Sequence, residues 1–387
     1  MTPDQLAPAL AELDTHSLRR VRRVLDGPQG VRVTLDGTSY LSFSSNDYLG
    51  LANHPALAEA VRKAVANIGV GAGAAHLLTG HHRLHHSLEN ELAKFVGLPA
   101  ALLFSTGYMA SLGVLPALLN RHGEVFEDKL NHASLVDAAV LSRAKLTRYP
   151  HADMAMLEQR LASSTAKVKL IATDTVFSMD GDLAPLAELQ ALARRYDAWL
   201  YLDDAHGFGV LGKHGQGALT LLNERNDPRL IYLATLGKAA GVSGAFVAGS
   251  AELIEWLVNK ARTYVFTTAQ PPMLAAAVSA SLRLIAAEGW RRAHLLALID
   301  RLKAGLAGLP WPLMPSATPI QPLLVGSNAE SMRLADALRA QGVLLPAIRP
   351  PTVPPGEARL RISLSAAHSL ADVDALCAAL KLLAQHA

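Results

Sequence analysis

The sequence predicts an α/β fold built on a mostly parallel central sheet with helices on both faces. Short apolar runs recur through the middle of the chain, and amphipathic segments separate them. A strand that is apolar along its whole length is typical of a parallel sheet that is covered on both sides. The chain has 387 residues, of which 50% are hydrophobic, so it can bury a large core and form more than one domain.

The order of these segments predicts three parts. Residues 1–45 form an N-terminal segment, residues 46–280 a large α/β domain and residues 281–387 a smaller C-terminal α+β domain. In the large domain we predict strands at 101–104, 169–173, 198–203, 230–235 and 245–249, with helices at 134–144 and 185–196. After a long helical stretch from about residue 275, we predict strands at 320–326 and 358–364, a helix at 329–342 and a final helix.

Composition limits the classes of function. Acidic and basic residues are interspersed and the net charge is only +3, so we expect no nucleic-acid partner. No run approaches the roughly 18 consecutive apolar residues of a membrane span, and the N-terminus has no basic region leading into an apolar one. The single cysteine, Cys377, excludes an intrachain disulfide and fits a reducing compartment. We therefore expect a cytoplasmic protein without a membrane partner.

Lys238 lies where the apolar run 230–235 gives way to a loop, in the segment TLGKAAGVSG (235–244). No carboxylate lies within several residues of it, and its neighbours are mostly small. An amine in such surroundings is poorly solvated as an ammonium, so we expect the pKa of Lys238 to fall toward neutrality. A lysine of this kind is suited to form a Schiff base with an aldehyde or a ketone. A solvated surface lysine is the alternative.

Asp203 ends the apolar run 198–203, and His206 follows three residues later. An acid at the carboxyl end of a parallel strand lies at the edge where open α/β sheets bind ligands. Pyridoxal phosphate requires a carboxylate there, because the carboxylate keeps the pyridine nitrogen protonated and the ring becomes an electron sink. We predict this role for Asp203 and place His206 beside the ring hydroxyl. The alternative is a turn-forming aspartate and a surface histidine.

The segment FSTGYMAS (104–111) supplies a third part of the predicted site. It follows a predicted strand and opens a helix, so its backbone N–H groups and the helix dipole favour an anion. Gly107 and Tyr108 are thus candidates for contacts to a phosphate. Glycine turns after strands are common, and this segment alone would indicate only a turn. The three segments together predict a Schiff-base amine, an acid for the ring nitrogen and a phosphate site.

Seven segments in order along the chain resemble the α-oxoamine synthases, which are pyridoxal-phosphate enzymes of fold type I. The resemblance covers nearly the whole chain. Two further segments, 71–82 and 347–356, resemble the members of that family that condense L-alanine with a pimeloyl thioester in biotin biosynthesis. The seven segments are SSNDYLGL (44–51), FSTGYM (104–109), NHASLVD (131–137), FSMDGD (177–182), DDAHGFGVLG (203–212), TLGKAAGVSG (235–244) and RLRISLSAAH (359–368).

The resemblance implies a role for each matching residue. The residues with catalytic roles would be Lys238, which anchors the cofactor and removes the α-proton, and Asp203, His206 and His132, of which His132 stacks on the ring. Ser178 would lie near the phenolic oxygen, and Thr235 would join Gly107 and Tyr108 at the phosphate. Thr267 and Thr268 resemble residues that reach the partner subunit's phosphate, which implies a homodimer. The implied cofactor-binding set is Gly107, Tyr108, His132, Ser178, Asp203, His206, Thr235, Lys238, Thr267 and Thr268.

The implied substrates are L-alanine and a pimeloyl thioester of coenzyme A or of acyl carrier protein. Arg361 matches the position that binds the amino-acid carboxylate, and a guanidinium suits that group because it binds bidentately. Alternation along the strand places Arg359 on the same face as Arg361, so Arg359 is the rival candidate. The implied substrate-binding residues are Arg20, Asn46, His132, Thr352 and Arg361. Arg20 is also compatible with a solvated basic helix face.

Three other functions remain open. Condensation of glycine with a short acyl-CoA is the closest rival, although Ala75 replaces a crowding threonine of the glycine-using relatives. In HHRLHH (81–86) the i,i+4 spacing pairs His81 with His85 and His82 with His86, as in zinc sites, but no glutamate completes that pattern, and we predict no metal. A pyridoxal-phosphate-carrying regulator would need a DNA-binding module, and no basic helix-turn-helix segment precedes the cofactor region.

Overall fold

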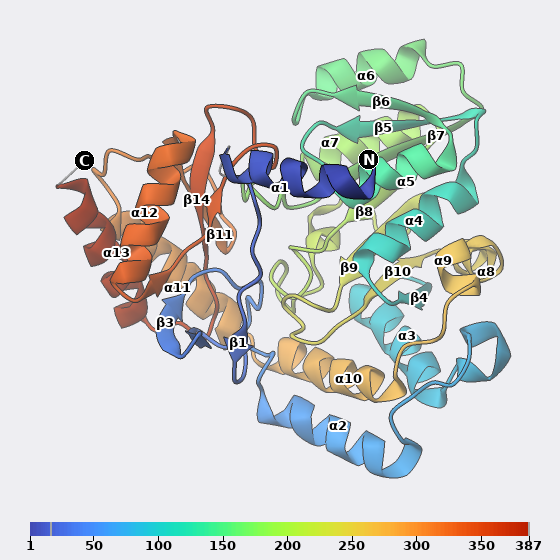
Figure 1. The fold of residues 1–387 in the computed structure, drawn as a ribbon. Coiled ribbons are helices and arrows are strands. Elements are labelled where there is room, and N and C mark those ends of the chain that lie inside the picture. The colour runs from blue at the N-terminus through green and yellow to red at the C-terminus, as the bar shows by residue number, and fades with distance from the viewer. Residues whose placement is uncertain (16–17, 386–387) are drawn as a thin grey trace.

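The computed structural model of the chain describes residues 1–15 and 18–385, and its largest element is a seven-stranded sheet (Figure 1). The strands are β4 (Ala100–Phe104), β5 (Gly123–Asp128), β6 (Lys145–Tyr149), β7 (Val168–Asp174), β8 (Ala198–Asp203), β9 (Leu230–Thr235) and β10 (Ala245–Gly249). Their order across the sheet is β4–β10–β9–β8–β7–β5–β6. Only β10 runs antiparallel to its neighbours, which confirms the mostly parallel central sheet.

Both faces of this sheet are buried against helices. Along β8, Leu200 and Leu202 belong to one core cluster and Tyr201 to the other, as the alternation of a strand requires. The first cluster includes side chains of α2 (Pro55–Ile68), α3 (Arg83–Val96), α6 (Met154–Ser163), α7 (Leu186–Arg195) and α10 (Pro272–Ala287). The second includes side chains of α4 (Gly107–Leu118), α5 (Ala133–Ser142), α8 (Ala251–Lys260) and α9 (Arg262–Val265).

The two ends of the chain build a second body beside the large sheet (Figure 1). Strands β1 (Leu25–Asp26), β2 (Arg32–Leu35), β3 (Thr38–Ser42) and β12 (Val343–Leu344) form one sheet, in which β3 and β12 are parallel. Strands β11 (Ile320–Gly326), β14 (Ala358–Ser363) and β13 (Ala347–Ile348) form an antiparallel sheet. The helices of this region are α1 (Leu6–Thr15), α11 (Trp290–Gly305), α12 (Asn328–Ala340) and α13 (Leu370–Ala384).

Most of the predicted elements are present, and β8, β9, β10 and β11 have the predicted bounds. Strands β5 and β6 are not among the predicted elements. The reason is that β5 is fully buried yet carries Glu124, Glu127 and Asp128, and its neighbour β6 carries Lys145 and Arg148. The three-part division stays a prediction. Its boundary between residues 280 and 281 falls inside α10, and the N-terminal segment shares a sheet with β12.

Among the described residues, no single helix has both the length and the apolar composition of a membrane span. Only α10 and α11 taken together meet the length and composition test, and they are bent by 68° at the break between them. Side chains of both helices are buried in the core, including Val278, Ile285 and Leu298.

Candidate active site

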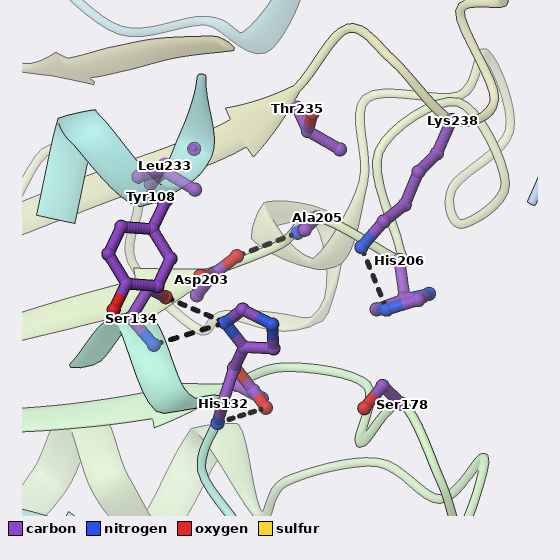
Figure 2. Close-up of a pocket in the computed structure, with 12 residues that line it drawn as sticks. Tyr108, His132, Ser134, Ser178, Asp203, Ala205, His206, Leu233, Thr235 and Lys238 are labelled. Carbon is purple, nitrogen blue, oxygen red and sulfur yellow. Dashed lines mark hydrogen bonds between the residues drawn. The ribbon is translucent and has the colours of Figure 1, made fainter. Parts of the chain in front are cut away.

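A cavity of about 200 Å³ lies where the parallel strands of the large sheet end. Asp174 ends β7, Asp203 ends β8 and Thr235 ends β9, so all three stand at the carboxyl edge. The cavity is lined by eight predicted site residues: Gly107, Tyr108, His132, Ser178, Asp203, His206, Thr235 and Lys238. Four residues that the sequence analysis did not single out complete the lining: Ser134, Asp174, Ala205 and Leu233. Figure 2 shows the side chains converging on this space.

The amine of Lys238 points into the cavity and lies 2.8 Å from Nε2 of His206 (Figure 2). The loop that carries it packs through Leu236, Ala239 and Ala240, which are buried. Burial lowers the pKa of Lys238 to about 8, although Asp203 and Asp174 oppose the shift. The predicted fall of this pKa is confirmed. The carboxylates that were absent from its own segment are supplied by the ends of β7 and β8.

His206 connects Lys238 to a residue that the sequence analysis missed. Its Nδ1 lies 2.7 Å from the hydroxyl of Tyr48, which is fully buried. Burial and the positive charges of Lys238 and Arg361 hold the pKa of His206 well below its usual value, so the ring is neutral. A neutral imidazole donates a hydrogen bond at one nitrogen and accepts one at the other. His206 therefore links the hydroxyl of Tyr48 to the amine of Lys238 by two hydrogen bonds.

Asp203 is buried, and its Oδ1 accepts a hydrogen bond from the backbone N–H of Ala205. Burial raises the pKa of Asp203, while Lys238 and His132 lower it. His132 is held in place by two contacts: its backbone N–H donates to Asp174, and its Nδ1 accepts from the backbone N–H of Ser134. The cavity therefore contains a buried carboxylate and a fixed imidazole, and both line the same space.

The start of α4 supplies the predicted anion site. Thr106 caps the helix by accepting a hydrogen bond from the backbone N–H of Met109, which leaves Gly107 and Tyr108 as its first residues. The first N–H groups of a helix have no partner inside it, so those of Gly107 and Tyr108 are available to an anion. Thr235 lines the cavity and also donates to the carbonyl of Gly244.

Two arginines on β14 were rival candidates for the substrate carboxylate. Arg361 is buried and donates to the carbonyl of Ser178 at 2.6 Å and to Oδ1 of Asn46 at 3.3 and 3.4 Å. No acidic side chain within the described ranges forms an ion pair with Arg361. Arg359 is instead paired with Asp180 at 2.7 Å and with Glu357 at 3.0 Å. Of the two arginines, Arg361 is thus the one without a carboxylate partner among the described residues.

The remaining predicted residues lie outside this cavity. Arg20 and Thr352 line a separate hollow of about 980 Å³ between the N-terminal segment and the stretch 347–352. Thr267 and Thr268 follow α9, and Thr268 forms an isolated β-bridge with Ala75. Thr268 is exposed, and neither threonine nor Ala75 belongs to the lining of the cavity.

The site residues that were not predicted differ in how clearly the sequence indicates them. Tyr48 lies in the segment SSNDYLGL. Asp174 directly follows the predicted strand 169–173, so a search for polar residues at strand ends would have found Asp174. Tyr48, Ala205 and Ser134 lie in segments that carry the resemblance, but nothing in their local sequence indicates a contact. Leu233 reads as an ordinary core residue, and only the fold places it beside Gly107.

The donor set fits pyridoxal phosphate. A protonated pyridine nitrogen needs a carboxylate partner, and Asp203 is a buried one. An aldehyde reacts with an unprotonated amine, and the pKa of Lys238 is lowered to about 8. A phosphate needs N–H donors, which the start of α4 provides. The three groups line one cavity, so one ligand can meet all of them.

Comparison with known proteins agrees with this geometry. The aminotransferase class I and II family matches residues 38–380. The 8-amino-7-oxononanoate synthase of Nitrosomonas eutropha is 60% identical over 386 residues, which cover 99% of this chain and all of that protein. The chain belongs to the 8-amino-7-oxononanoate synthase family. The resemblance to α-oxoamine synthases and the fold of a type I pyridoxal-phosphate enzyme are thereby confirmed.

Two solved structures share the fold over most of the chain. The 8-amino-7-oxononanoate synthase of Francisella tularensis is 30% identical, with a TM-score of 0.76, over 90% of this chain and 98% of that one. A variant serine palmitoyltransferase from S. paucimobilis, solved with a bound PLP–myriocin aldimine, is 26% identical with a TM-score of 0.91. That match covers 99% of this chain and 97% of the other.

Proposed function

We propose that the chain catalyses the decarboxylative condensation of L-alanine with a pimeloyl thioester. The reaction yields 8-amino-7-oxononanoate, carbon dioxide and the free thiol, and it is a step of biotin biosynthesis. The observation that carries this proposal is the cavity lined by Lys238, Asp203 and the start of α4. It lies in a chain that is 60% identical to an 8-amino-7-oxononanoate synthase over the whole length of that relative. Glycine-using α-oxoamine synthases are the second candidate.

Pyridoxal phosphate, when bound, supplies a protonated ring that withdraws electrons from the substrate α-carbon. Lys238 would hold its aldehyde carbon, Asp203 would hold a proton at its pyridine nitrogen, and the N–H groups of Gly107 and Tyr108 would bind its phosphate. His132 lines the same cavity and would stack on the ring. Ser178 and His206 would lie near its phenolic oxygen.

The chain's own groups would also move the substrate proton. With a pKa of about 8, about a tenth of Lys238 is uncharged at pH 7, far more than of an ordinary lysine, so its Nζ is able to accept the α-proton of alanine. His206 lies 2.8 Å from this nitrogen and stays neutral. It therefore orients the amine without adding a competing positive charge.

Arg361 would bind the carboxylate of alanine, with Asn46 beside it. A buried guanidinium without a carboxylate partner binds an anion strongly, because its own desolvation has already occurred on folding and a bound carboxylate compensates its charge. Loss of this carboxylate as carbon dioxide accompanies the condensation, so the contact with Arg361 exists only until that step. His132, which the resemblance also places near the substrate, faces the same cavity.

The hollow that contains Arg20 and Thr352 would receive the acyl chain and its carrier. Arginines line the neighbouring hollow, among them Arg19, Arg22 and Arg339. Coenzyme A and acyl carrier protein are both anionic, so this surface suits either carrier. Both thioesters remain candidates.

We further propose a homodimer in which Thr267 and Thr268 reach the phosphate of the partner subunit. Both threonines lie outside the cavity of their own chain, which supports a role in another one. Mixing Lys238→Ala protein with Thr268→Ala protein tests this, since a hybrid dimer contains one site with neither substitution. Regained activity in the mixture would support the shared site, whereas the average of the two parents would contradict it. We also propose a cytoplasmic location, because Cys377 is a free thiol.

Product mass spectrometry tests the reaction. Purified protein is incubated with L-alanine or glycine and with pimeloyl-CoA, pimeloyl-acyl carrier protein, acetyl-CoA or succinyl-CoA. We expect 8-amino-7-oxononanoate from alanine and a pimeloyl thioester, and none from Lys238→Ala protein. Faster turnover of glycine with acetyl-CoA or succinyl-CoA would overturn the proposal in favour of the second candidate. Borohydride reduction and peptide mapping should place the cofactor on Lys238, with Lys213 as an internal control.

A further inference from the structure

Three ionisable side chains meet outside the cavity, where the turn His76–Gly80 leads into α3 (Figure 1). They are His81, which follows that turn, and His86 and Glu89 on α3. One ligand atom from each lies within 4.8 Å of the others. The i,i+4 pairs that the sequence analysis weighed did not include this set, because Glu89 lies three residues after His86 and His81 precedes the helix.

We propose that His81, His86 and Glu89 bind a divalent transition-metal ion of the zinc class. Two imidazoles and one carboxylate form a familiar ligand set for Zn²⁺, and water completes the coordination where the site is open. His86 is exposed, so an ion reaches the site directly from solvent. The site is separate from the cofactor cavity and does not depend on the proposed reaction.

The carboxylate of Glu89 is poorly solvated, and a hydrogen bond fixes its orientation. Its side chain is 12% exposed, and its Oε1 accepts a hydrogen bond from the backbone N–H of Leu103 on β4. Within residues 1–15 and 18–385, no lysine or arginine pairs with Glu89, and its ion-pair contact is to Nε2 of His81 at 3.8 Å. A carboxylate in this setting needs a cation, and a metal ion between these two atoms supplies one.

His81 is held by its other ring nitrogen. Its Nδ1 lies 3.0 Å from Nδ1 of His76, and His76 stacks on Tyr264 with ring centroids 4.8 Å apart. We assign the shared proton to Nδ1 of His81, which leaves the lone pair of its Nε2 directed toward Glu89. A hydrogen bond of this kind fixes the tautomer and orientation of a metal-bound histidine. His76 is therefore a positioning residue for the site.

The distances allow closure with small movements. Ligands bound to zinc at about 2.0 Å in a tetrahedral arrangement lie about 3.3 Å from one another. The 3.8 Å between His81 and Glu89 is slightly longer than this, and the exposed side chain of His86 is able to rotate inward. A fourth histidine, His85, is excluded because its Nδ1 accepts the backbone N–H of His82, which requires a proton on Nε2.

Isothermal titration of EDTA-treated holoenzyme with ZnCl₂ tests the proposal. We expect one Zn²⁺ per chain, and at least about 10-fold weaker binding for His86→Ala and for His76→Phe. His76→Phe keeps the aromatic stack but removes the acceptor for His81. His122→Ala, an exposed histidine elsewhere, is the matched control and should bind as the wild type does.

Thermal unfolding gives a second readout, because an ion bound only to the folded state raises Tm. We expect Zn²⁺ to raise the Tm of wild-type and His122→Ala protein, and not that of His86→Ala protein. Equal Zn²⁺ affinity in wild-type and His86→Ala protein would overturn the proposal, as would the absence of stoichiometric binding to the wild type. Product formation is measured separately, so the failure of either proposal leaves the other intact.

Discussion

Nζ of Lys238 lies 2.8 Å from Nε2 of His206, and the other ring nitrogen of His206 lies 2.7 Å from the hydroxyl of Tyr48. Tyr48 is fully buried, Lys238 is half-buried, and the imidazole of His206 is neutral. The arrangement holds the lysine amine at one place in the cavity without a formal ion pair. Burial lowers the pKa of Lys238 although Asp203 and Asp174 lie nearby, and the direct hydrogen-bond partner of its amine, His206, is uncharged.

The first prediction concerns the pH dependence of cofactor uptake. The uncharged amine attacks an aldehyde and the ammonium does not, so the reactive fraction of Lys238 rises as pH increases through about 8. We expect the rate at which apoprotein binds pyridoxal phosphate covalently to increase between pH 6 and 9 and then to level off. Stopped-flow absorbance measures it, and Lys238→Ala protein is the control. A rate independent of pH in this range would contradict the lowered pKa.

The second prediction separates the two arginines of β14. Arg361→Lys keeps a positive charge but loses the bidentate contact, so we expect KM for alanine to rise about 10-fold or more with Tm nearly unchanged. Arg359→Ala leaves Asp180 without its partner and should lower the free energy of unfolding by about 2 kcal/mol. Steady-state kinetics and urea unfolding distinguish these effects. A raised KM in Arg359→Ala protein of normal stability would reverse the assignment.

The sequence predicts the large sheet well because its central strands are continuous apolar runs bounded by turn residues. Strands β8, β9 and β10 of this sheet therefore have the predicted bounds, as does β11 of the three-stranded sheet. Strands β5 and β6 were not predicted because charged side chains interrupt their apolar pattern. Glu124 of β5 and Lys145 of β6 form an ion pair between the two strands. Partners far away in the sequence neutralise those charges, and local pattern does not reveal them.

The cavity followed from sequence for a similar reason. Asp203, Thr235 and Lys238 stand at the ends of predictable strands, and parallel strands bring their carboxyl ends to one edge. The contact of His206 with Tyr48 joins segments 158 residues apart, and that of Arg361 with Ser178 joins segments 183 residues apart. These pairings depend on how the C-terminal body packs against the large sheet. A sequence pattern alone does not establish that packing.

The third prediction concerns stability and pH. His151 bridges Asp128 and Asp182, and these contacts raise its pKa to about 10 from the ordinary 6.5. A raised histidine pKa stabilises the folded state fully below pH 6.5, and the contribution is lost as pH rises through about 10. We expect His151→Gln to lower the free energy of unfolding by at least about 1 kcal/mol more at pH 6 than at pH 9.5.

Urea unfolding at the two pH values measures this difference. His122→Gln, which replaces an exposed histidine, is the matched control and should show the same small effect at both. An equal loss of stability for His151→Gln at pH 6 and pH 9.5 would mean that the charge of His151 does not contribute.

The last prediction concerns the choice of alanine over glycine. The resemblance aligns Ala75 with a threonine that crowds the amino-acid side chain in glycine-using relatives. Ala75 does not line the cavity of its own chain, and it is bridged to Thr268, which we propose reaches the partner subunit's site. Ala75→Thr should therefore act in the partner's cavity, where the added branch meets the methyl group of alanine. One methyl group is worth about 1 to 3 kcal/mol, so we expect the preference for alanine to fall about 10-fold or more.

The ratio of kcat/KM for alanine to that for glycine, measured with one thioester, checks this expectation. Ala74→Thr is the matched control, because it adds the same atoms at the neighbouring residue and not at the position that the resemblance aligns with the threonine. If Ala75 only packs the turn, the substitution lowers Tm and leaves the ratio unchanged. An unchanged ratio in folded, cofactor-loaded Ala75→Thr dimer would show that this residue does not select the amino acid. A ratio that falls in both variants would indicate a general distortion of the turn rather than a clash at residue 75.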